Sequence, residues 1–242
     1  MKHESTTKVL VAGSTGFCGQ AVVLALAAHP KYQPIAHIRP ESSRLESATK
    51  KFKDVGAVVL CCEFKDLPEQ LSEYKPRVVS SFTGTTKKQM KKEGGSYQEI
   101  DYDLNHQLIN IAKTHKSAFV YLSSMGVEWA KWNAYLQARY LVEQELQESS
   151  LSYAIIRPGI LSGSRDHARP AEEVGAWFSH RLANLYQKVG LQNLADGSKP
   201  LDAPEVADFV MRIFENTLII QADQNVRNIY ELTDIHRILR GE

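Results

Sequence analysis

The sequence predicts an α/β protein with a doubly wound arrangement, in which helices cover both faces of a parallel sheet. Short runs of apolar, β-branched residues recur along the chain, and most intervals between them are long enough for a crossover helix. The length of 242 residues lies within the range of one sizeable domain. We therefore expect a single domain over residues 1–242, in which elements of about residues 160–218 form a small, mostly helical C-terminal cap.

The expected strands are the apolar runs themselves, because strands of a parallel sheet are covered on both faces and need not alternate. They are Lys8–Ala12, Pro34–Ile38, Ala57–Leu60, Arg77–Phe82, Ala118–Leu122 and Tyr153–Ile156. Helices are expected in the gaps, over Phe17–Ala28, Tyr97–His115 and Trp132–Glu148, and further along over residues 172–189 and 204–218.

Composition narrows the class of protein. The 29 Lys and Arg nearly balance the 28 Asp and Glu, so the net charge of +1 gives no global reason to expect a nucleic acid or an anionic membrane as partner. Residues 1–8 do not resemble a signal peptide, and the early apolar stretch Ala21–Ala28 is too short to span a bilayer. Because Cys18, Cys61 and Cys62 are odd in number and lack zinc-binding spacing, we expect reduced thiols, no metal site and a cytoplasmic location.

A glycine-rich loop follows the first expected strand and opens the first expected helix. Its residues are Gly13, Ser14, Thr15, Gly16, Phe17, Cys18 and Gly19. Glycines let the backbone turn tightly and approach a pyrophosphate, while the helix N-terminus offers N–H groups and a positive dipole end to its charge. This position between strand and helix predicts a Rossmann-type dinucleotide-binding unit, and the alternative is an ordinary glycine-rich turn.

The end of the second expected strand indicates which nucleotide binds. An Asp or Glu there would favour the ribose 2′-hydroxyl of NAD, whereas an Arg suits the 2′-phosphate of NADP. The strand ends at Arg39, whose guanidinium fork matches a phosphate, and Glu41 lies beyond it. NADP is therefore the expected cofactor, with NAD less favoured, and an arginine that merely faces solvent is the alternative.

Further motifs resemble a known superfamily. They are the glycine loop, Ser123-Ser124 after the fifth strand, Tyr135 early in the next helix, and Arg157-Pro158-Gly159 after the sixth strand. Together they resemble the extended and atypical short-chain dehydrogenase/reductases. Gly84-Thr85-Thr86, residues 121–126 (YLSSMG), 134–140 (AYLQARY) and 155–161 (IIRPGIL), and Arg169-Pro170 are most similar to the branch that resembles the Tat-interacting oxidoreductase.

The resemblance implies a set of site residues. Tyr135 takes the position of the tyrosine that exchanges a proton with the substrate oxygen, and Ser124, rather than Ser123, takes that of the serine that binds the same oxygen. A lysine four residues after the tyrosine normally supports it and holds the nicotinamide ribose, but this chain has Arg139 there, which keeps the charge and changes its shape. The cofactor is further expected to contact Phe64, Thr83, Gly84, Ser123, Pro158, Ile160 and Arg165.

Two functions from different classes remain open. One is an NADP(H)-dependent oxidoreductase of a small carbonyl-type substrate, and the other is an NADP(H)-binding regulatory or scaffold protein with little activity, favoured by Arg139 and by the basic segment 87–95. An epimerase or dehydratase of a nucleotide sugar has less room. A protein partner or a homodimer is a further possibility, since Trp129, Trp132 and Trp177 belong either to an interface or to the core and cleft.

Overall fold

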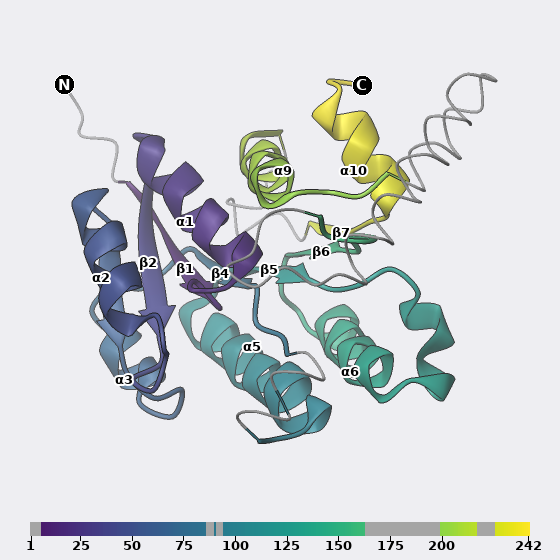
Figure 1. Cartoon of the computed structure of the whole chain (residues 1–242), viewed down its shortest axis with the longest axis horizontal. Coiled ribbons are helices and arrows are strands. Elements are labelled where there is room, and N and C mark those ends of the chain that lie inside the picture. Colours follow the sequence, from purple (N-terminus) through teal and green to yellow (C-terminus); the bar gives the residue numbers. More distant parts are fainter. Residues whose placement is uncertain (1–5, 86–89, 91–93, 163–198, 217–225) are drawn as a thin grey trace.

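The computed structural model describes residues 6–85, 90, 94–162, 199–216 and 226–242. They contain a seven-stranded sheet in the order β3-β2-β1-β4-β5-β6-β7, in which every neighbouring pair is parallel (Figure 1). The strands are β1 (Thr7–Ala12), β2 (Tyr32–Ile38), β3 (Val58–Cys61), β4 (Val78–Ser81), β5 (Ala118–Leu122), β6 (Tyr153–Ile156) and β7 (Arg227–Tyr230). The predicted fold class is confirmed.

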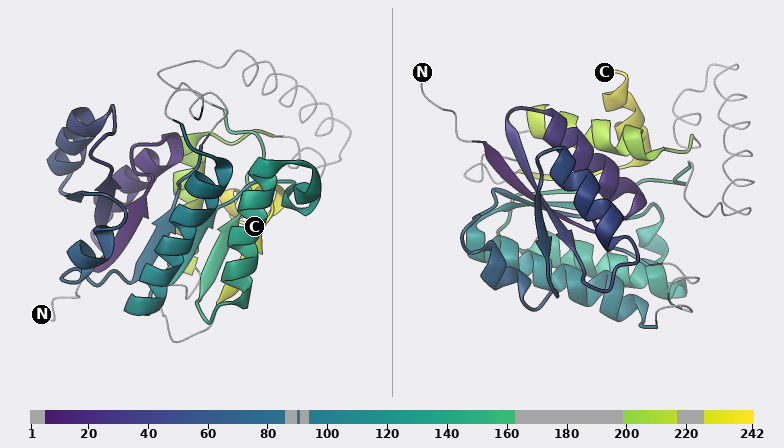
Figure 2. Two further views of the ribbon diagram at one scale, coloured as in Figure 1. Left: turned by 90° about the horizontal axis from the view of Figure 1, so that it is seen from below. Right: turned by 60° about the vertical axis from the view of Figure 1, so that its left-hand side comes forward.

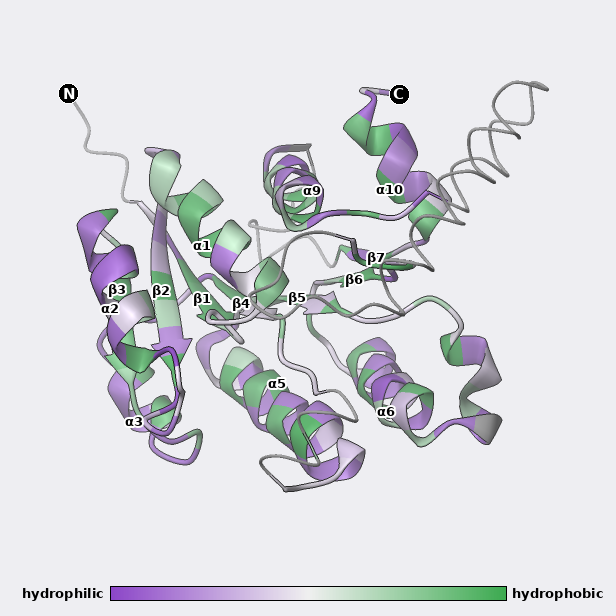
Figure 3. Ribbon diagram, viewed as in Figure 1, coloured by the Kyte–Doolittle hydropathy of each residue, from purple (hydrophilic) through white to green (hydrophobic). Residues whose placement is uncertain are grey.

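Two apolar layers flank the sheet, as the doubly wound prediction requires. One face is covered by α1 (Phe17–Ala28), α2 (Leu45–Asp54), α9 (Ala203–Asn216) and α10 (Leu232–Leu239), and the other by α3 (Leu67–Leu71), α5 (Leu104–His115) and α6 (Ala134–Glu148). Figure 2 shows the two helical layers on opposite sides of the sheet, and Figure 3 shows apolar residues along the strands and the inner helix faces. The core therefore consists of two halves that share the sheet.

Most predicted elements lie where the sequence places them. Helix α1 and strands β5 and β6 have the predicted bounds, and the other four predicted strands differ by one or two residues at an end. The helix expected over Tyr97–His115 is split, because Gln98–Asp103 (η1) form a π-helix before α5 begins. Residues 163–198 lie outside the described part of the chain, so the helix expected at 172–189 and the cap remain predictions.

Five elements of the described chain were not predicted from the apolar runs, among them the 3₁₀-helix η2 (Val127–Trp132). Helix α2 is largely polar and buries only Ala48 and Phe52, and α3 has five residues. Strand β7 alternates exposed and half-buried residues at the sheet edge, and α10 follows it directly. Among the described residues, no helix is both long enough and apolar enough to cross a membrane.

Candidate functional site

The glycine loop lies where the strand order reverses. Strand β1 pairs with β2 on one side and with β4 on the other, so the chain leaves β1 at the switch point where open α/β sheets bind ligands. Gly13 has a φ of 74°, and a Cβ there would lie 2.6 Å from the Phe82 carbonyl carbon and oxygen. A Cβ on Gly19 would overlap the Gly13 carbonyl. Only glycine fits at either position, and the bare backbone that results is the cradle a pyrophosphate needs.

Side chains of the loop have structural partners. The Ser14 hydroxyl is fully buried and donates to the His37 carbonyl at 2.6 Å, which ties the loop to the end of β2. Cys18 is 5% exposed, within the apolar layer under α1. Gly16 is the N-cap of α1 and has no side chain to cap it, so the start of the helix is open to an anion. The loop therefore offers its backbone rather than the side chains of Ser14 and Cys18.

Two arginines follow β2. Arg39 forms an ion pair with Glu41, with 3.0 Å between Nη1 and Oε1, and its side chain is 41% exposed. Arg44, which the motif comparison did not single out, donates from Nη1 to the Thr15 carbonyl at 2.9 Å. Its guanidinium therefore lies against the glycine loop. The sequence signal was a second arginine five residues after Arg39, at the start of a helix that was not predicted.

Two aromatic rings, those of His37 and Phe64, lie near the carboxyl end of β2. The His37 ring is 2% exposed, its Nε2 donates to the Cys62 carbonyl at 2.9 Å, and burial lowers its pKa. Phe64, expected beside the adenine, is 7% exposed and meets the His37 ring edge-on at 4.6 Å between centroids. The structure thus brings Phe64 to the end of β2 and mostly covers its ring.

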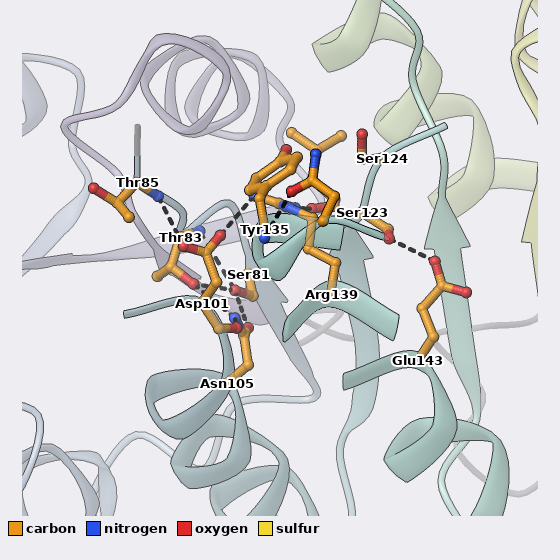
Figure 4. Close-up of polar contacts among 12 residues, drawn as sticks. Ser81, Thr83, Thr85, Asp101, Asn105, Ser123, Ser124, Tyr135, Arg139 and Glu143 are labelled. Atoms are coloured by element: carbon orange, nitrogen blue, oxygen red, sulfur yellow. Dashed lines mark hydrogen bonds and ion pairs between the residues drawn. The ribbon is translucent and has the colours of Figure 1, made fainter. Parts of the chain in front are cut away.

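The ends of β4 and β5 carry hydroxyl groups in two networks (Figure 4). After β4, Thr83 accepts from the Asn105 side-chain amide at 3.1 Å, and Ser81 donates to the same side chain at 2.5 Å. After β5, Ser123 donates to Glu143 at 2.5 Å and is 3% exposed. Ser124 is half-buried and donates only to the neighbouring Met125 carbonyl, at 3.1 Å. Ser124 is therefore the more accessible of the two serines.

Glu143 belongs to a larger ion-pair network. Its carboxylate, 1% exposed, pairs with Arg157 at 2.5 Å, and Arg157 also reaches Glu231 at 2.6 Å. Glu231 is in turn the N-cap of α10 in a reciprocal capping arrangement with Asp234. The network therefore joins α6 to the segments that follow β6 and β7. The sequence signalled Arg157 through its motif, but gave no sign of Glu143 as its partner.

Tyr135 lies in the first turn of α6, directly over Arg139. Asn133 caps this helix by accepting from the Tyr135 N–H at 2.9 Å. The Arg139 guanidinium carbon is 4.8 Å from the centre of the Tyr135 ring, and the Tyr97 ring meets Tyr135 edge-on at 5.4 Å. In Figure 4, Ser124 and Tyr135 lie on the same side of Arg139. The predicted tyrosine, serine and arginine therefore lie together at the carboxyl end of β5.

Arg139 itself is almost fully buried. It donates from Nη1 to the Leu122 carbonyl at 2.6 Å and forms an ion pair from Nη2 with Asp101 at 3.1 Å. Burial would lower the pKa of Arg139, but the neighbouring Tyr121, Tyr135 and Asp101 raise it overall. Burial also raises the pKa of Asp101, and the Arg139 cation opposes that rise. Asp101 is a site residue that the motif comparison missed, because it lies in the π-helix and not in a recognisable motif.

The remaining predicted residues lie around the end of β6 or outside the described chain. The Pro158 carbonyl accepts from the Met125 N–H at 2.9 Å, and Ile160 is 38% exposed. Trp129 is 66% exposed, which fits an interface or an open cleft. Arg165 and Trp177 fall in the undescribed segment 163–198.

The fold and this site define the chain as a Rossmann-type nucleotide-binding protein. A sequence profile of a family described as NAD(P)H-binding matches residues 13–178, and the chain belongs to that family. Protein fmp52, mitochondrial, from Emericella nidulans is 24% identical over 188 residues, which cover 75% of this chain and 78% of that protein. Protein fmp52-1, mitochondrial, from Aspergillus terreus is 25% identical over 175 residues, covering 71% and 74%.

Solved structures agree on the fold. The FolM alternative dihydrofolate reductase 1 of Brucella suis, in complex with NADP, has a TM-score of 0.63 at 16% identity, covering 96% of this chain and 95% of that one. A 3-oxoacyl-(acyl-carrier-protein) reductase of Agrobacterium tumefaciens, with NADP bound, has a TM-score of 0.65 at 12% identity, covering 96% of each chain. This likeness shows that the chain shares the fold of these proteins, and the family match bears out the NAD(P)-binding part of the predicted relationship.

The predicted cytoplasmic location is wrong. The curated relatives reported above are both named mitochondrial, as is fmp52 of Aspergillus fumigatus. The prediction used the three cysteines, which are odd in number and lack zinc-binding spacing, and these features indicate a reducing compartment. These features do not distinguish the cytosol from other reducing compartments.

Proposed function

We propose that this protein is an NADP(H)-dependent oxidoreductase that reduces a small carbonyl compound. The observation that carries the proposal is the arrangement of Tyr135 and Ser124 at the sheet edge that also holds the glycine loop. A tyrosine and a serine hydroxyl can together bind one substrate oxygen, the tyrosine as proton donor and the serine as hydrogen-bond donor. When bound, the dinucleotide would supply the hydride for the carbonyl carbon.

The residues present fit a dinucleotide. A Cβ on Gly13 or Gly19 would overlap neighbouring backbone, so the loop carries no side chain at these positions, and the start of α1 at Gly16 has no side-chain cap. These features would hold the pyrophosphate through backbone N–H groups. Thr83 and Gly84, at the end of β4, would lie along a ribose, and Pro158 and Ile160 along the nicotinamide side.

The preference for NADP rests on the two arginines after β2. Arg39 has an exposed guanidinium, and Arg44 lies 2.9 Å from the glycine-loop carbonyl of Thr15. One guanidinium group directly after β2 and a second one against the glycine loop suit a 2′-phosphate, which accepts charged hydrogen bonds at several oxygens. Both structural neighbours reported above hold NADP, which supports the same choice.

The alternative function, a regulatory protein that binds NADP(H) without turnover, gains no support from the comparisons, whose structural neighbours are named reductases. A mitochondrial location is the one that the names of the curated relatives support.

The experiment is a calorimetric titration of the purified protein with NADPH and NADH, repeated for Arg39→Ala, Arg44→Ala and the distant control Arg237→Ala. We expect each of the first two variants to weaken NADPH binding about tenfold, and NADH binding little, because a lost charged hydrogen bond is worth about 1.5 kcal/mol. Arg237 pairs with Asp234 on α10, so its loss should change neither affinity. Equal losses for NADPH and NADH in Arg44→Ala would mean that Arg44 only braces the loop, and no binding by the natural protein would refute the proposal.

Turnover is measured alongside, with NADPH and a panel of aldehydes and ketones. We expect Tyr135→Phe to lose at least 100-fold in kcat, since general acid catalysis contributes about that much or more, and to keep its NADPH affinity. A Tyr135→Phe variant as active as the natural protein would rule out this tyrosine as the acid.

A further inference from the structure

The position that holds lysine in the superfamily is occupied here by a cation that the protein itself holds in place. Nη1 of Arg139 donates to the Leu122 carbonyl, Nη2 pairs with Asp101, and the side chain is 8% exposed. A lysine ammonium on its flexible stem can turn toward a ligand, whereas a planar guanidinium bonded on two sides is fixed. Both terminal nitrogens of Arg139 are thus engaged by the protein rather than directed to a ribose.

Asp101 is the residue that fixes this cation. Its side chain is fully buried, with one carboxylate oxygen accepting from the Thr85 N–H at 3.1 Å and the other pairing with Arg139 (Figure 4). Asp101 lies in the π-helix η1, a local irregularity that often marks functional sites. Its carboxylate therefore joins the loop after β4 to the helix that carries Tyr135.

Gly84 shows how tightly these three segments fit. A Cβ at this position would overlap Nη2 of Arg139 and lie 3.2 Å from Oδ1 of Asp101. The loop after β4 therefore passes directly over the ion pair. The buried pair is one interlocked unit made from the β4 loop, the π-helix and α6.

The Tyr135 ring packs against the Arg139–Asp101 ion pair. The Arg139 guanidinium carbon lies 4.8 Å from its ring centre and 5.9 Å from that of Tyr121 on β5. Among the described residues, the titratable groups around Tyr135 are Arg139 from its own helix, Tyr121 from β5, and Tyr97 and Asp101 from the segment before α5. Arg139 and Asp101 carry opposite charges among these groups, so each contributes to the electrostatic potential at the phenol with the opposite sign.

We infer that Asp101 is a positioning residue for the reaction proposed above: it fixes the Arg139 cation against Tyr135 and sets the charge that the Tyr135 hydroxyl experiences. The inference rests on the proposed function for its chemistry. The electrostatic effect of Asp101 and Arg139 on Tyr135, however, can be measured without cofactor or substrate. In place of a mobile ammonium, this chain uses a guanidinium held by a buried carboxylate.

The test is an ultraviolet titration of tyrosinate in the full-length protein, with the Tyr135 contribution isolated by subtracting the same variant carrying Tyr135→Phe. Asp101→Asn keeps an acceptor for the Thr85 N–H and removes the negative charge, so the midpoint for Tyr135 should fall by about one pH unit. Arg139→Gln removes the positive charge, so the midpoint should rise by about one unit. The matched control is Glu143→Gln, which neutralises the carboxylate of the neighbouring buried ion pair with Arg157 and should leave the midpoint within a few tenths of a unit.

Shifts of opposite sign support the inference, because a purely structural role would move both midpoints the same way or not at all. No shift, or two shifts of one sign, would overturn it. If Asp101→Asn does not fold, the double variant Asp101→Asn/Arg139→Gln leaves no unpaired charge and replaces it. Its midpoint should lie below that of Arg139→Gln alone, and a midpoint equal to or above it would overturn the inference.

Turnover separates this inference from the proposed function. If a carbonyl substrate is found, Asp101→Asn should lower kcat at least tenfold and shift the pH profile in the same direction as the titration. Its NADPH affinity should stay within about twofold, since Asp101 is fully buried beneath the β4 loop and exposes no atom to a ligand. Opposite titration shifts in a protein that reduces no carbonyl would support the electrostatic role of Asp101 and refute the reaction.

Discussion

Replacing Gly13 by alanine tests the close approach on which the nucleotide site depends. The substitution has two costs. Gly13 has a φ of 74°, a backbone conformation that costs any residue with a Cβ roughly 1 kcal/mol. The new Cβ would also lie 2.6 Å from the Phe82 carbonyl and 2.8 Å from the Thr83 nitrogen, and both are backbone atoms that cannot turn aside.

The size of the effect follows from these contacts. Overpacking that forces backbone shifts costs about 2 kcal/mol more, so Gly13→Ala should lower the free energy of unfolding by about 3 kcal/mol. For a chain of this size that corresponds to a fall in Tm of about 10 °C. Gly56→Ala is the matched control, because Gly56 has a φ of 80° and no atom within 4 Å of its Cβ position. It should lose only about 1 kcal/mol, or about 3 °C.

Urea unfolding and calorimetric NADPH titration measure the two consequences separately. We expect Gly13→Ala to bind NADPH at least tenfold more weakly than Gly56→Ala, because β1 and β4 must separate to admit the methyl group and the loop moves with them. Equal stabilities for the two variants would refute the reasoning, since only the backbone contact at Phe82 distinguishes them.

Two further predictions concern stability. Burial lowers the pKa of His37, so the folded chain takes up a proton less readily than the unfolded one; stability should be complete above the ordinary histidine pKa of about 6.5 and fall by up to about 1 kcal/mol per pH unit below it. Urea unfolding between about pH 7.5 and pH 5.5 should show this fall in stability with pH. His37→Gln should remove more of it than the control His106→Gln, whose ring is half-exposed. An unchanged pH dependence in His37→Gln would contradict its assignment to His37. Of the two partners of Arg157, Glu143 is 1% exposed and Glu231 is 47% exposed, so Glu143→Ala should cost about 3 kcal/mol and Glu231→Ala about 1 kcal/mol, mostly from the lost helix cap. Thermal unfolding of both variants checks this, and a reversed order would show that burial does not set the strength of the network.

The sequence predicted the elements whose signals are local. Buried parallel strands are nearly continuous apolar runs. Helix Phe17–Ala28 begins within the glycine-rich motif and ends before His29-Pro30. The bounds of these elements were therefore predicted to within two residues. Helix α2 and strand β7 were missed because each buries little of its surface. Their stability comes from neighbours that are distant in the sequence, and no local pattern carries that information.

The motifs likewise predicted which site residues exist, but not what each one contacts. Tyr135, Ser124 and Arg139 were identified through the resemblance of their motifs to those of the superfamily, and the structure places all three near one another. Asp101 was missed, because its partner lies 38 positions away and becomes a neighbour only when η1 packs against α6. The partners of a buried charge therefore had to come from the fold.

The contacts of Arg139, which the motif did not predict, change how this residue should be tested. Arg139→Lys restores the superfamily's residue, and increased turnover would be the simple expectation if arginine were only a poor substitute. In this structure a lysine has one nitrogen where the arginine uses two, so it cannot reach both the Leu122 carbonyl and Asp101. The acceptor it fails to reach would be left unsatisfied in a buried site, at a cost of roughly 1–3 kcal/mol. Low turnover of Arg139→Lys would thus result from the lost contacts with the Leu122 carbonyl or Asp101 and would say nothing about the chemistry of lysine. The effect of charge on Tyr135 is better tested with Asp101→Asn and Arg139→Gln.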